Sequence, residues 1–581
     1  MKSTIADLLS KALADLPELS DALHGIDIAA TIERTRDDSH GDFASNVAMR
    51  LAKPARRSPR DLAGQIVEHI GDSDELDKVE IAGPGFINFY LGASSYHSEL
   101  KSILARGEDY GRKPPTPSPR VHLEFVSANP TGPLHVGHGR HAAFGATVGN
   151  LLESQGLPVH REYYVNDAGR QMDILGVSVC IRWLELKGAD VSFPDAGYRG
   201  EYIRDIAASV NTTGIEDVSA EALMAGLPAD APDGDKEAHI EALIDAAKRE
   251  FGEDGFDRIR QQALESIRDD IEDDLAEFGV HYDRWFSEQS LTKTDRIDKA
   301  LGVLKERGML YEKDGATWFR ATDFGDEKDR VVVRDNGVKT YFASDIAYHF
   351  DKRERGFDHL IDILGADHHG YVSRVKAGLA AMGYAGDDLE VELVQFVALF
   401  RGGEKMQMST RSGEFETLRD LRNEVGNDAA RFFYVSRSND QHLDFDLDIA
   451  KSESSDNPVY YIQYAHARIA RVFGKLTEAG HSYDAGNAAL ERLVEPQERA
   501  LMKRLSRYAE ILETAARNRA PQTLVHYLRD LANDFHTLYN AHQFILDDAS
   551  LRDARLLLCK ATKTVIANGL DILGVSAPDR M

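Results

Sequence analysis

The sequence predicts an α/β protein: a central domain with a Rossmann-type, doubly wound parallel sheet and an insertion, a small N-terminal α/β domain and a C-terminal helical bundle. Three observations predict it. Residues 120–170 repeat a strand, loop and helix order, four prolines at 111–119 separate an N-terminal segment, and the pattern from Tyr460 onward is helical almost without break. The expected divisions are residues 1–110, a stiff linker at 111–119, 120–400 with an insertion at about 183–285, a connecting segment at 401–455, and 456–581.

The N-terminal segment alternates helical and strand patterns. Apolar spacing predicts a helix at 5–16, residues 41–46 should open a second helix, and Ser58-Pro59 starts a third. Two short strands about a Gly-Pro-Gly turn are expected at 79–91. Because no catalytic pattern appears in this segment, we expect the chemistry to lie elsewhere.

Composition limits the class of protein. At 581 residues, with 42% hydrophobic and 29% charged residues, the chain is long enough for several domains. It has no apolar run of about 18 residues and no signal-peptide core, so we expect a cytoplasmic protein without a membrane partner. Its two cysteines are too few for a disulfide framework or a Cys-based zinc site.

Net charge gives a weak argument against a nucleic-acid partner. The chain carries a formal charge of −28, but residues 456–581 hold 16 Lys and Arg against 15 Asp and Glu. Because affinity for phosphate depends on local cations, this least acidic segment is the best place for such a partner.

The stretch at 121–153 is the most informative part of the chain. Residues 121–126 alternate as a buried strand does, a Pro/Gly loop follows, and residues 137–153 have helical spacing. The first turn of that helix offers unpaired N–H groups and a positive dipole end to an anion. His135 and His138 flank this turn, and Gly137 keeps the backbone close to a ligand. The pattern predicts a phosphate-binding site in which the two imidazoles donate hydrogen bonds to phosphate oxygens.

Two other interpretations of this stretch compete. His135, His138 and His141 could be zinc ligands, but no Glu stands where a His-Glu-x-x-His motif needs its base. The histidines could also lie on the surface at an ordinary helix start.

Residues 127–140 closely resemble the ATP signature of class I aminoacyl-tRNA synthetases, named for His-Ile-Gly-His, in its arginyl form. The resemblance implies an arginine–tRNA ligase: ATP and L-arginine give arginyl-adenylate and pyrophosphate, and the arginyl group passes to tRNA(Arg). It implies Mg²⁺ with the nucleotide, no zinc, and a monomer. Residues implied to bind ATP are His135, Gly137, His138, Gly139, Met408 and Ser409.

A second catalytic segment is expected at residues 402–413, which resemble the family's Lys-Met-Ser-Lys-Ser motif. Aligning Met408-Ser409 with the motif's Met-Ser puts Gln407 and Thr410 where lysines would stand. Together with His135 and His138, Lys405 and Arg411 are therefore the candidate catalytic residues. Arg140 and Mg²⁺ are alternative sources of the missing positive charge. The alternative is a solvated Gly-rich loop with incidental charges.

The resemblance also implies an arginine pocket, since paired carboxylates recognise a planar guanidinium selectively. Asp345 and Glu288 are implied to bind the guanidinium, together with Tyr341. Ser127, Ala128, Asn129 and His138 would hold the amino and carboxylate end, and His368 would close the pocket. Glu124 pairs either with the substrate's ammonium or with a neighbouring base.

The remaining segments complete the expected fold. Residues 339–349 and 359–370 each read as a strand running into a helix, with polar residues where the strands end. Helices are predicted at 460–476, 490–517, 523–544 and 551–573. The resemblance implies that residues 1–110 meet the tRNA elbow near the D-loop and that 456–581 bind the anticodon.

Three other functions remain open at this point. The chain could be a His-x-Gly-His synthetase for another amino acid, a small-molecule nucleotidylyltransferase, or a non-catalytic tRNA-binding relative. The altered second motif is the reason to consider the last.

Overall fold

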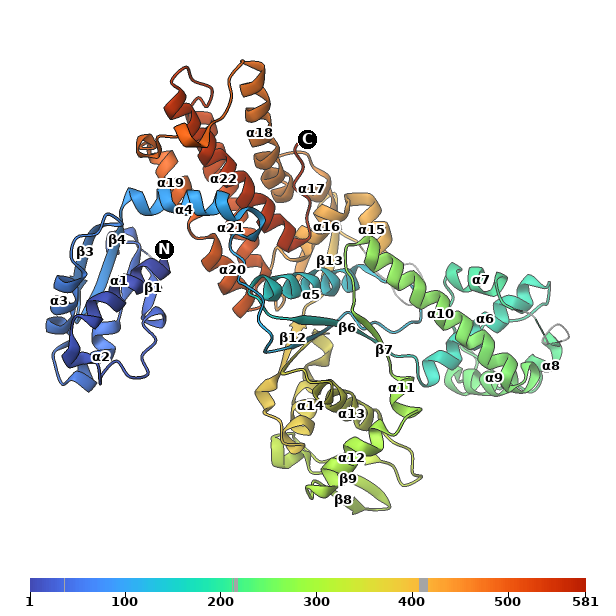
Figure 1. Ribbon diagram of the computed structural model, residues 1–581. Helices are drawn as coiled ribbons and strands as arrows, with labels where there is room; N and C mark the ends of the chain where they lie inside the picture. Colours follow the sequence, from blue (N-terminus) through green and yellow to red (C-terminus); the bar gives the residue numbers. More distant parts are fainter. Residues whose placement is uncertain (36, 212, 214–217, 407–415) are drawn as a thin grey trace.

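A five-stranded parallel sheet lies at the centre of the molecule (Figure 1). The computed structural model describes residues 1–35, 37–211, 213, 218–406 and 416–581. The strand order is β12-β11-β5-β6-β7, and all neighbours are parallel. The strands are β5 (Val121–Phe125), β6 (Val159–Val165), β7 (Arg284–Ser287), β11 (His359–Gly365) and β12 (Leu389–Val394). Because the order reverses between β5 and β11, the sheet is doubly wound, as predicted.

Helices cover both faces of this sheet, so every residue of β5 is buried. Phe125 faces helix α5 at Gly145, where an added Cβ would come within 2.3 Å of its ring. Glu124 points the other way, toward Lys352 of α13. The helices next to the sheet are α5 (Val136–Ser154), α6 (Arg170–Leu186), α13 (Tyr341–Glu354) and α14 (His369–Ala381).

The strand predicted near Thr340 is absent among the described residues, and this prediction was wrong. Residues 341–354 are helix α13, and the Thr340 side chain caps it by accepting the Ala343 N–H. The strand before it, β10 (Arg330–Val333), belongs to a separate three-stranded antiparallel sheet with β8 (Leu310–Lys313) and β9 (Ala316–Phe319). Buried Ala343, Ile346 and Ala347 follow a helical spacing, so the helical part of the prediction begins already at Tyr341.

The N-terminal domain carries its own four-stranded antiparallel sheet, of order β1-β2-β4-β3. The helix expected from residue 41 starts at Val47, because residues 43–45 pair with β4 as strand β2. The elements are α1 (Lys2–Ala14), β1 (Ile32–Arg34), β2 (Phe43–Ser45), α2 (Val47–Ala55), α3 (Pro59–Ile70), β3 (Leu76–Ala82) and β4 (Phe86–Leu91).

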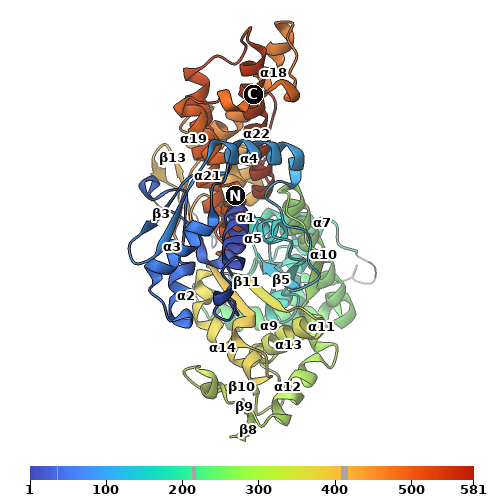
Figure 2. The same ribbon diagram turned by 60° about the vertical axis from the view of Figure 1, so that its left-hand side comes forward.

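Helix α4 (Ala93–Arg106) connects this domain to the rest of the molecule. It packs on the C-terminal helices α19 (Pro496–Leu505) and α22 (Ala549–Leu573). The N-terminal domain lies beside these helices, away from the parallel sheet (Figures 1 and 2). An ion pair joins Arg34 of β1 to Glu510 of α20 at 2.8 Å.

The insertion and the segments after it are mostly helical. In the insertion the helices are α7 (Glu201–Ala208), α8 (Ala220–Met224), α9 (Lys236–Phe251) and α10 (Glu253–Glu277). After β7 come α11 (Gln289–Thr292) and α12 (Arg296–Glu306), and after β12 come β13 (Val397–Arg401), β14 (Glu404–Lys405), α15 (Leu418–Val425), α16 (Asn427–Tyr434), β15 (Leu443–Asp446) and α17 (Leu447–Lys451).

The C-terminal part is a helical bundle, as predicted. One predicted helix, at 490–517, is in fact two helices that break near Ser506. The helices are α18 (Pro458–Glu478), α19 (Pro496–Leu505), α20 (Tyr508–Arg517), α21 (Pro521–Ala541) and α22 (Ala549–Leu573). None of the helices in the described ranges combines the length and apolar character needed to cross a membrane.

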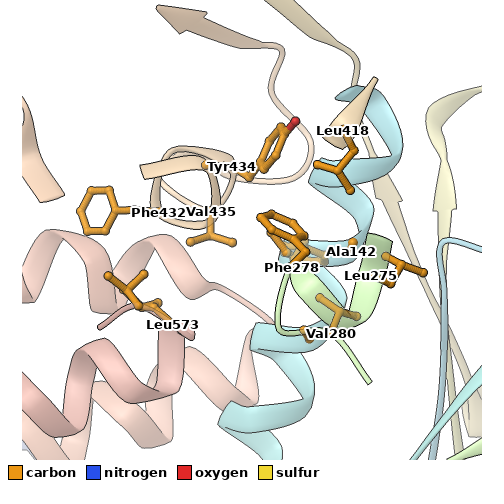
Figure 3. Packing of buried hydrophobic residues seen from close by; sticks show 14 of the residues in the cluster. Ala142, Leu275, Phe278, Val280, Leu418, Phe432, Tyr434, Val435 and Leu573 are labelled. Carbon is orange, nitrogen blue, oxygen red and sulfur yellow. The ribbon is translucent and has the colours of Figure 1, made fainter. Parts of the chain in front are cut away.

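Helix α16 lies where the parallel-sheet domain, the insertion and the C-terminal bundle meet (Figure 3). Buried side chains from α5, α10, α15, α16 and α22 pack there, among them Ala142, Leu275, Leu418, Tyr434 and Leu573. The buried Arg431 guanidinium donates to the carbonyls of Leu573 (3.0 Å) and Phe278 (2.9 Å). This packing fixes the helical bundle against the parallel sheet.

Candidate active site

A cavity of about 570 Å³ opens at the carboxyl ends of β5, β6, β11 and β12. This is where ligands bind in open α/β sheets. Eight of the predicted site residues line it: Ser127, Ala128, Asn129, His135, Gly137, His138, Asp345 and His368.

The chain leaves β5 through a sharp kink. Val126 and Ser127 have φ angles of 67° and 42°, which a branched residue such as Val adopts only under constraint. The Ser127 N–H closes the turn on the Phe125 carbonyl at 3.0 Å. The kink turns residues 127–129 along the cavity wall.

The Ser127 hydroxyl is engaged in holding this kink. It donates to Glu124 Oε1 and accepts the Tyr164 N–H, both at 3.1 Å. Any contact with a ligand must therefore use the remaining lone pair of the hydroxyl or the main chain.

The start of α5 holds both signature histidines in one arrangement. His135 Nδ1 accepts the Gly137 N–H at 3.0 Å, and His138 Nδ1 accepts the His135 N–H at 3.3 Å. The two rings stack with centroids 3.6 Å apart. A neutral ring whose Nδ1 accepts a hydrogen bond carries its proton on Nε2, so both rings can act as Nε2–H donors.

Electrostatics favour the neutral form of these rings. Burial lowers the pKa of His135, and burial together with the neighbouring His135 and His141 lowers the pKa of His138 well below its ordinary value. The pair is therefore neutral at pH 7 and donates hydrogen bonds without adding charge.

The two glycines of the signature have different surroundings. A Cβ on Gly137 would come within 2.8 Å of the His135 ring, so glycine permits the histidine stack. Gly139 packs against Leu418 and Tyr434 and is not among the described residues that line the cavity. Its assignment to ATP binding stays a prediction, while its packing role is plain.

The opposite end of the cavity is acidic. Burial raises the pKa of Asp345 to about 6, and burial together with the nearby Asp345 raises the pKa of Glu288 to about 7. Glu288 Oε2 is buried without a hydrogen-bond partner among the described residues. Since a cation favours the ionised form of a carboxyl, these two groups suit a guanidinium.

Two tyrosines at this end were missed by the sequence analysis. Tyr164 and Tyr371 line the cavity and act to lower the pKa of Glu288 and Asp345, respectively, against the larger effect of burial. Glu288 itself is not among the described lining residues, whereas its neighbour Tyr164 is. The place of Tyr164 near the carboxyl end of β6 was the one signal that could have revealed it.

Tyr341 is more exposed than expected. It is the first residue of α13, its side chain is 64% exposed, and it is not among the described lining residues. Its hydroxyl lies near Gly169, where an added Cβ would approach it to 3.1 Å. A role in arginine binding stays a prediction.

The second motif lies only partly within the described residues. Lys405 is exposed on β14, whereas Met408, Ser409 and Arg411 lie outside the described residues. Residues that follow the motif pair with the signature: the Leu418 N–H donates to the Leu134 carbonyl at 2.8 Å. The chain after the motif is thus tied to the start of α5.

Arg140 is not the missing cation. Its guanidinium is buried and donates to three main-chain carbonyls, those of Gln395, Ser438 and Gln441, at 2.7–2.8 Å. These bonds hold the segment between β12 and β15, so the sequence-based suggestion that Arg140 meets phosphate is wrong.

A second cavity, of about 590 Å³, adjoins the first and shares Asn129, His135 and His138 with it. Its far wall comes from the insertion and was not predicted. Tyr202 donates to the Thr131 carbonyl at 2.6 Å, and Arg199 lines the same wall.

The sequence left zinc ligation by His135, His138 and His141 as an alternative. Within the described ranges, no group of three or more His, Cys, Asp or Glu side chains could hold a metal ion. His135 and His138 use Nδ1 as the acceptor of backbone N–H groups. The residues described here do not fit a dedicated metal site.

Comparison with known proteins agrees with this geometry. Residues 99–193 and 233–451 match the family model "tRNA synthetases class I (R), catalytic domain". Residues 3–91 match the arginyl tRNA synthetase N-terminal domain, and 462–581 the DALR anticodon binding domain.

Individual relatives match over the whole length. The chain is 55% identical to the arginine–tRNA ligase of Thioalkalivibrio sulfidiphilus and 54% identical to that of Halorhodospira halophila, with 100% of each chain covered. The Thermus thermophilus arginyl-tRNA synthetase structure shares the fold, with a TM-score of 0.70 and 23% identity over 97% of this chain and 99% of that one.

A parallel sheet with a His-x-Gly-His turn at its switch point, matched by this catalytic-domain model, defines a class I aminoacyl-tRNA synthetase. The acidic end of the cavity and the N-terminal domain narrow the class further. The chain belongs to the arginyl-tRNA synthetase family, which confirms the prediction from residues 127–140.

Proposed function

We propose that this chain ligates L-arginine to tRNA(Arg) through an arginyl-adenylate, releasing AMP and pyrophosphate. The observation that carries the proposal is one cavity lined both by a neutral histidine pair at a helix N-terminus and by Asp345, with Glu288 close to Asp345 and the pKa of both carboxyls raised. Full-length relatives at 54–55% identity support it.

Activation begins with ATP at the start of α5. An oxygen of the arginine carboxylate attacks the α-phosphorus, and the bond to the pyrophosphate oxygen breaks. The chain needs no nucleophile of its own for this step, so its tasks are positioning and stabilising charge. We assign that stabilisation to the α5 N–H groups and the Nε2–H groups of His135 and His138, with Gly137 leaving room for the phosphate. Transfer follows when a ribose hydroxyl of the tRNA attacks the arginyl carbonyl and AMP leaves.

Recognition of arginine is assigned to the acidic end. Asp345 and Glu288 would each accept guanidinium N–H groups, which lysine cannot offer in the same planar fork. Ala128, Asn129 and the Ser127 main chain would face the amino and carboxylate end, and His368 the pocket mouth. Tyr341 would join them if α13 moves toward the ligand.

The charge on the triphosphate needs further cations. We propose that Lys405 and Arg411 supply part of it and that Met408 and Ser409 contact the nucleotide. Mg²⁺ would accompany ATP, since this ion keeps phosphate and water ligands in preference to all-protein cages. No step is assigned to it here, because the described residues do not form a site for it.

Partners and location complete the proposal. We propose that the N-terminal domain meets the tRNA elbow, that residues 456–581 bind the anticodon, and that the enzyme acts in the cytoplasm as a monomer. A sedimentation mass near 64.5 kDa is expected for the free protein, and a mass of twice that value would contradict the monomer.

Pyrophosphate exchange tests the function directly. The protein should catalyse exchange with ATP and arginine, assayed with and without tRNA(Arg), and should not do so with the other nineteen amino acids. Exchange with another amino acid would make it a different synthetase. Absence of exchange under every condition, with tRNA still bound, would favour the non-catalytic relative.

A further inference from the structure

Three buried acids lie side by side across the central sheet. Glu124 is the register partner of Glu162 on β6 and of Asp362 on β11. All three are at most 6% exposed. Since isolated buried carboxylates are strongly unfavourable, the row requires cations close by.

Helix α13 supplies one cation, Lys352, that two of these acids share. Lys352, which is fully buried, lies 2.7 Å from Glu124 Oε2 and 2.8 Å from Asp362 Oδ1. His349 Nε2 lies 2.7 Å from the other Asp362 oxygen, and its Nδ1 lies 2.8 Å from the Asp345 carbonyl. Lys352 therefore bridges two strands beneath the substrate cavity and is linked to the helix turn that carries Asp345.

Glu124 connects this buried pair to the cavity. Its Oε2 is held by Lys352, and its Oε1 accepts the Ser127 hydroxyl at the kink after β5. Glu124 itself lines the cavity. Backbone in such a conformation costs about 1–3 kcal/mol per residue and persists only where the surroundings hold it. The Lys352–Glu124–Ser127 chain of contacts is one such support.

We propose that Lys352 is a positioning residue for the amino acid: by fixing the Glu124 carboxylate it holds the kink at Val126 and Ser127 and so aims residues 127–129 at the substrate. The inference rests on the proposed function and deepens it. It favours the neighbouring base, Lys352, over the substrate's ammonium as the partner of Glu124.

The same sheet offers a matched control. Arg355, the residue that directly follows α13, donates to both oxygens of Glu162 at 2.6 and 2.9 Å. Glu162 is as buried as Glu124, but it does not line the cavity, and within the described residues it makes no hydrogen bond to Val126 or Ser127. Removing either cation should destabilise the sheet, whereas only the loss of Lys352 should disturb the kink.

The test compares Lys352→Met with Arg355→Met in arginine-dependent pyrophosphate exchange with tRNA(Arg) present. Both variants should lose thermal stability. Lys352→Met should raise the KM for arginine about 10- to 100-fold, the range that a small misplacement of positioning groups produces, with less than about a threefold change in the KM for ATP. Arg355→Met should leave the ratio of the two KM values unchanged.

Lys352→Gln covers the case in which the Met variant does not fold. An amide can donate to Glu124 while losing the charge, so this variant should fold better and show a smaller shift in the same direction. Equal changes in both KM values, as in the Arg355 control, would overturn the positioning role. A wild-type protein without arginine-dependent exchange would instead contradict the proposed function.

Discussion

The two ends of the active-site cavity are built in different ways. The phosphate end comes from five consecutive residues, 135–139, whose backbone and rings bond to one another within one helical turn. The arginine end gathers Tyr164, Glu288, Asp345 and Tyr371 from four separate elements. The first end is therefore a local structure that the sequence can encode alone, and the second depends on the tertiary fold.

The two ends also differ in the direction in which burial shifts the pKa values of their side chains. Burial lowers the pKa of the histidines, which are neutral over the physiological range, and raises the pKa of the two carboxyls into that range. Each group with a shifted pKa suits its proposed ligand. The neutral histidines donate hydrogen bonds to the triphosphate, and the two carboxyls ionise when the guanidinium cation binds.

The largest expected effect is at the phosphate end. Replacing His138 by Ala should lower kcat for activation about 10²–10³-fold, because a donor to the developing phosphate charge is lost. The arginine KM should change little in pyrophosphate exchange. His138→Gln keeps an N–H donor and should recover part of the rate; unchanged activity in the Ala variant would remove His138 from the chemistry.

At the arginine end, Asp345→Asn should raise the arginine KM about 100-fold and the ATP KM by much less. An amide leaves the guanidinium without a charged partner, a loss of about 2–3 kcal/mol. Initial-rate kinetics with each substrate varied in turn measure the split. Equal effects on both substrates would place Asp345 outside the pocket.

In the unmutated protein, a change of pH should affect the two ends of the cavity differently. As the pH falls from 8 to 5.5, Glu288 and Asp345 take up protons through pKa values of about 7 and about 6, so the arginine KM should rise about tenfold or more. The ATP KM should change much less, because burial lowers the pKa of His135 and His138 and so favours their neutral forms.

The same pKa shift has a consequence for stability. A carboxyl whose pKa is raised on folding binds its proton more tightly in the folded state. The empty protein should therefore lose stability as the pH rises from about 4.5 through 7, and saturating arginine should offset that loss. Thermal melts with and without arginine at pH 6 and 8 measure the difference, and arginine stabilisation independent of pH would contradict it.

The smallest effect is expected in the second motif. Lys405→Ala and Arg411→Ala should each lower kcat by about tenfold or less, with little change in the arginine KM, since Lys405 is exposed and an exposed charge is screened by salt. Thr410→Lys restores the family motif and should partly rescue the Ala variants. Full kcat in both Ala variants, with no effect of Thr410→Lys, would remove the loop from the active site.

The sequence by itself determined the strand, the Pro/Gly loop and the helix α5, which begins at Val136, one residue before its predicted start. These depend on interactions between residues a few positions apart: apolar spacing, a capping side chain and unpaired N–H groups at one helix end. The helical tail followed from the same short-range periodicity, although the break near Ser506 was missed.

Only the tertiary structure decided the partners of the charged groups. Glu124 meets Lys352, Arg140 turns to three main-chain carbonyls, and Asp345 lies on a helix that follows no strand of the parallel sheet. Each outcome depends on groups tens to hundreds of positions away. The energy of a charge in a protein depends on which groups surround it, and strand register and helix packing, which bring those groups together, leave no local pattern in the sequence.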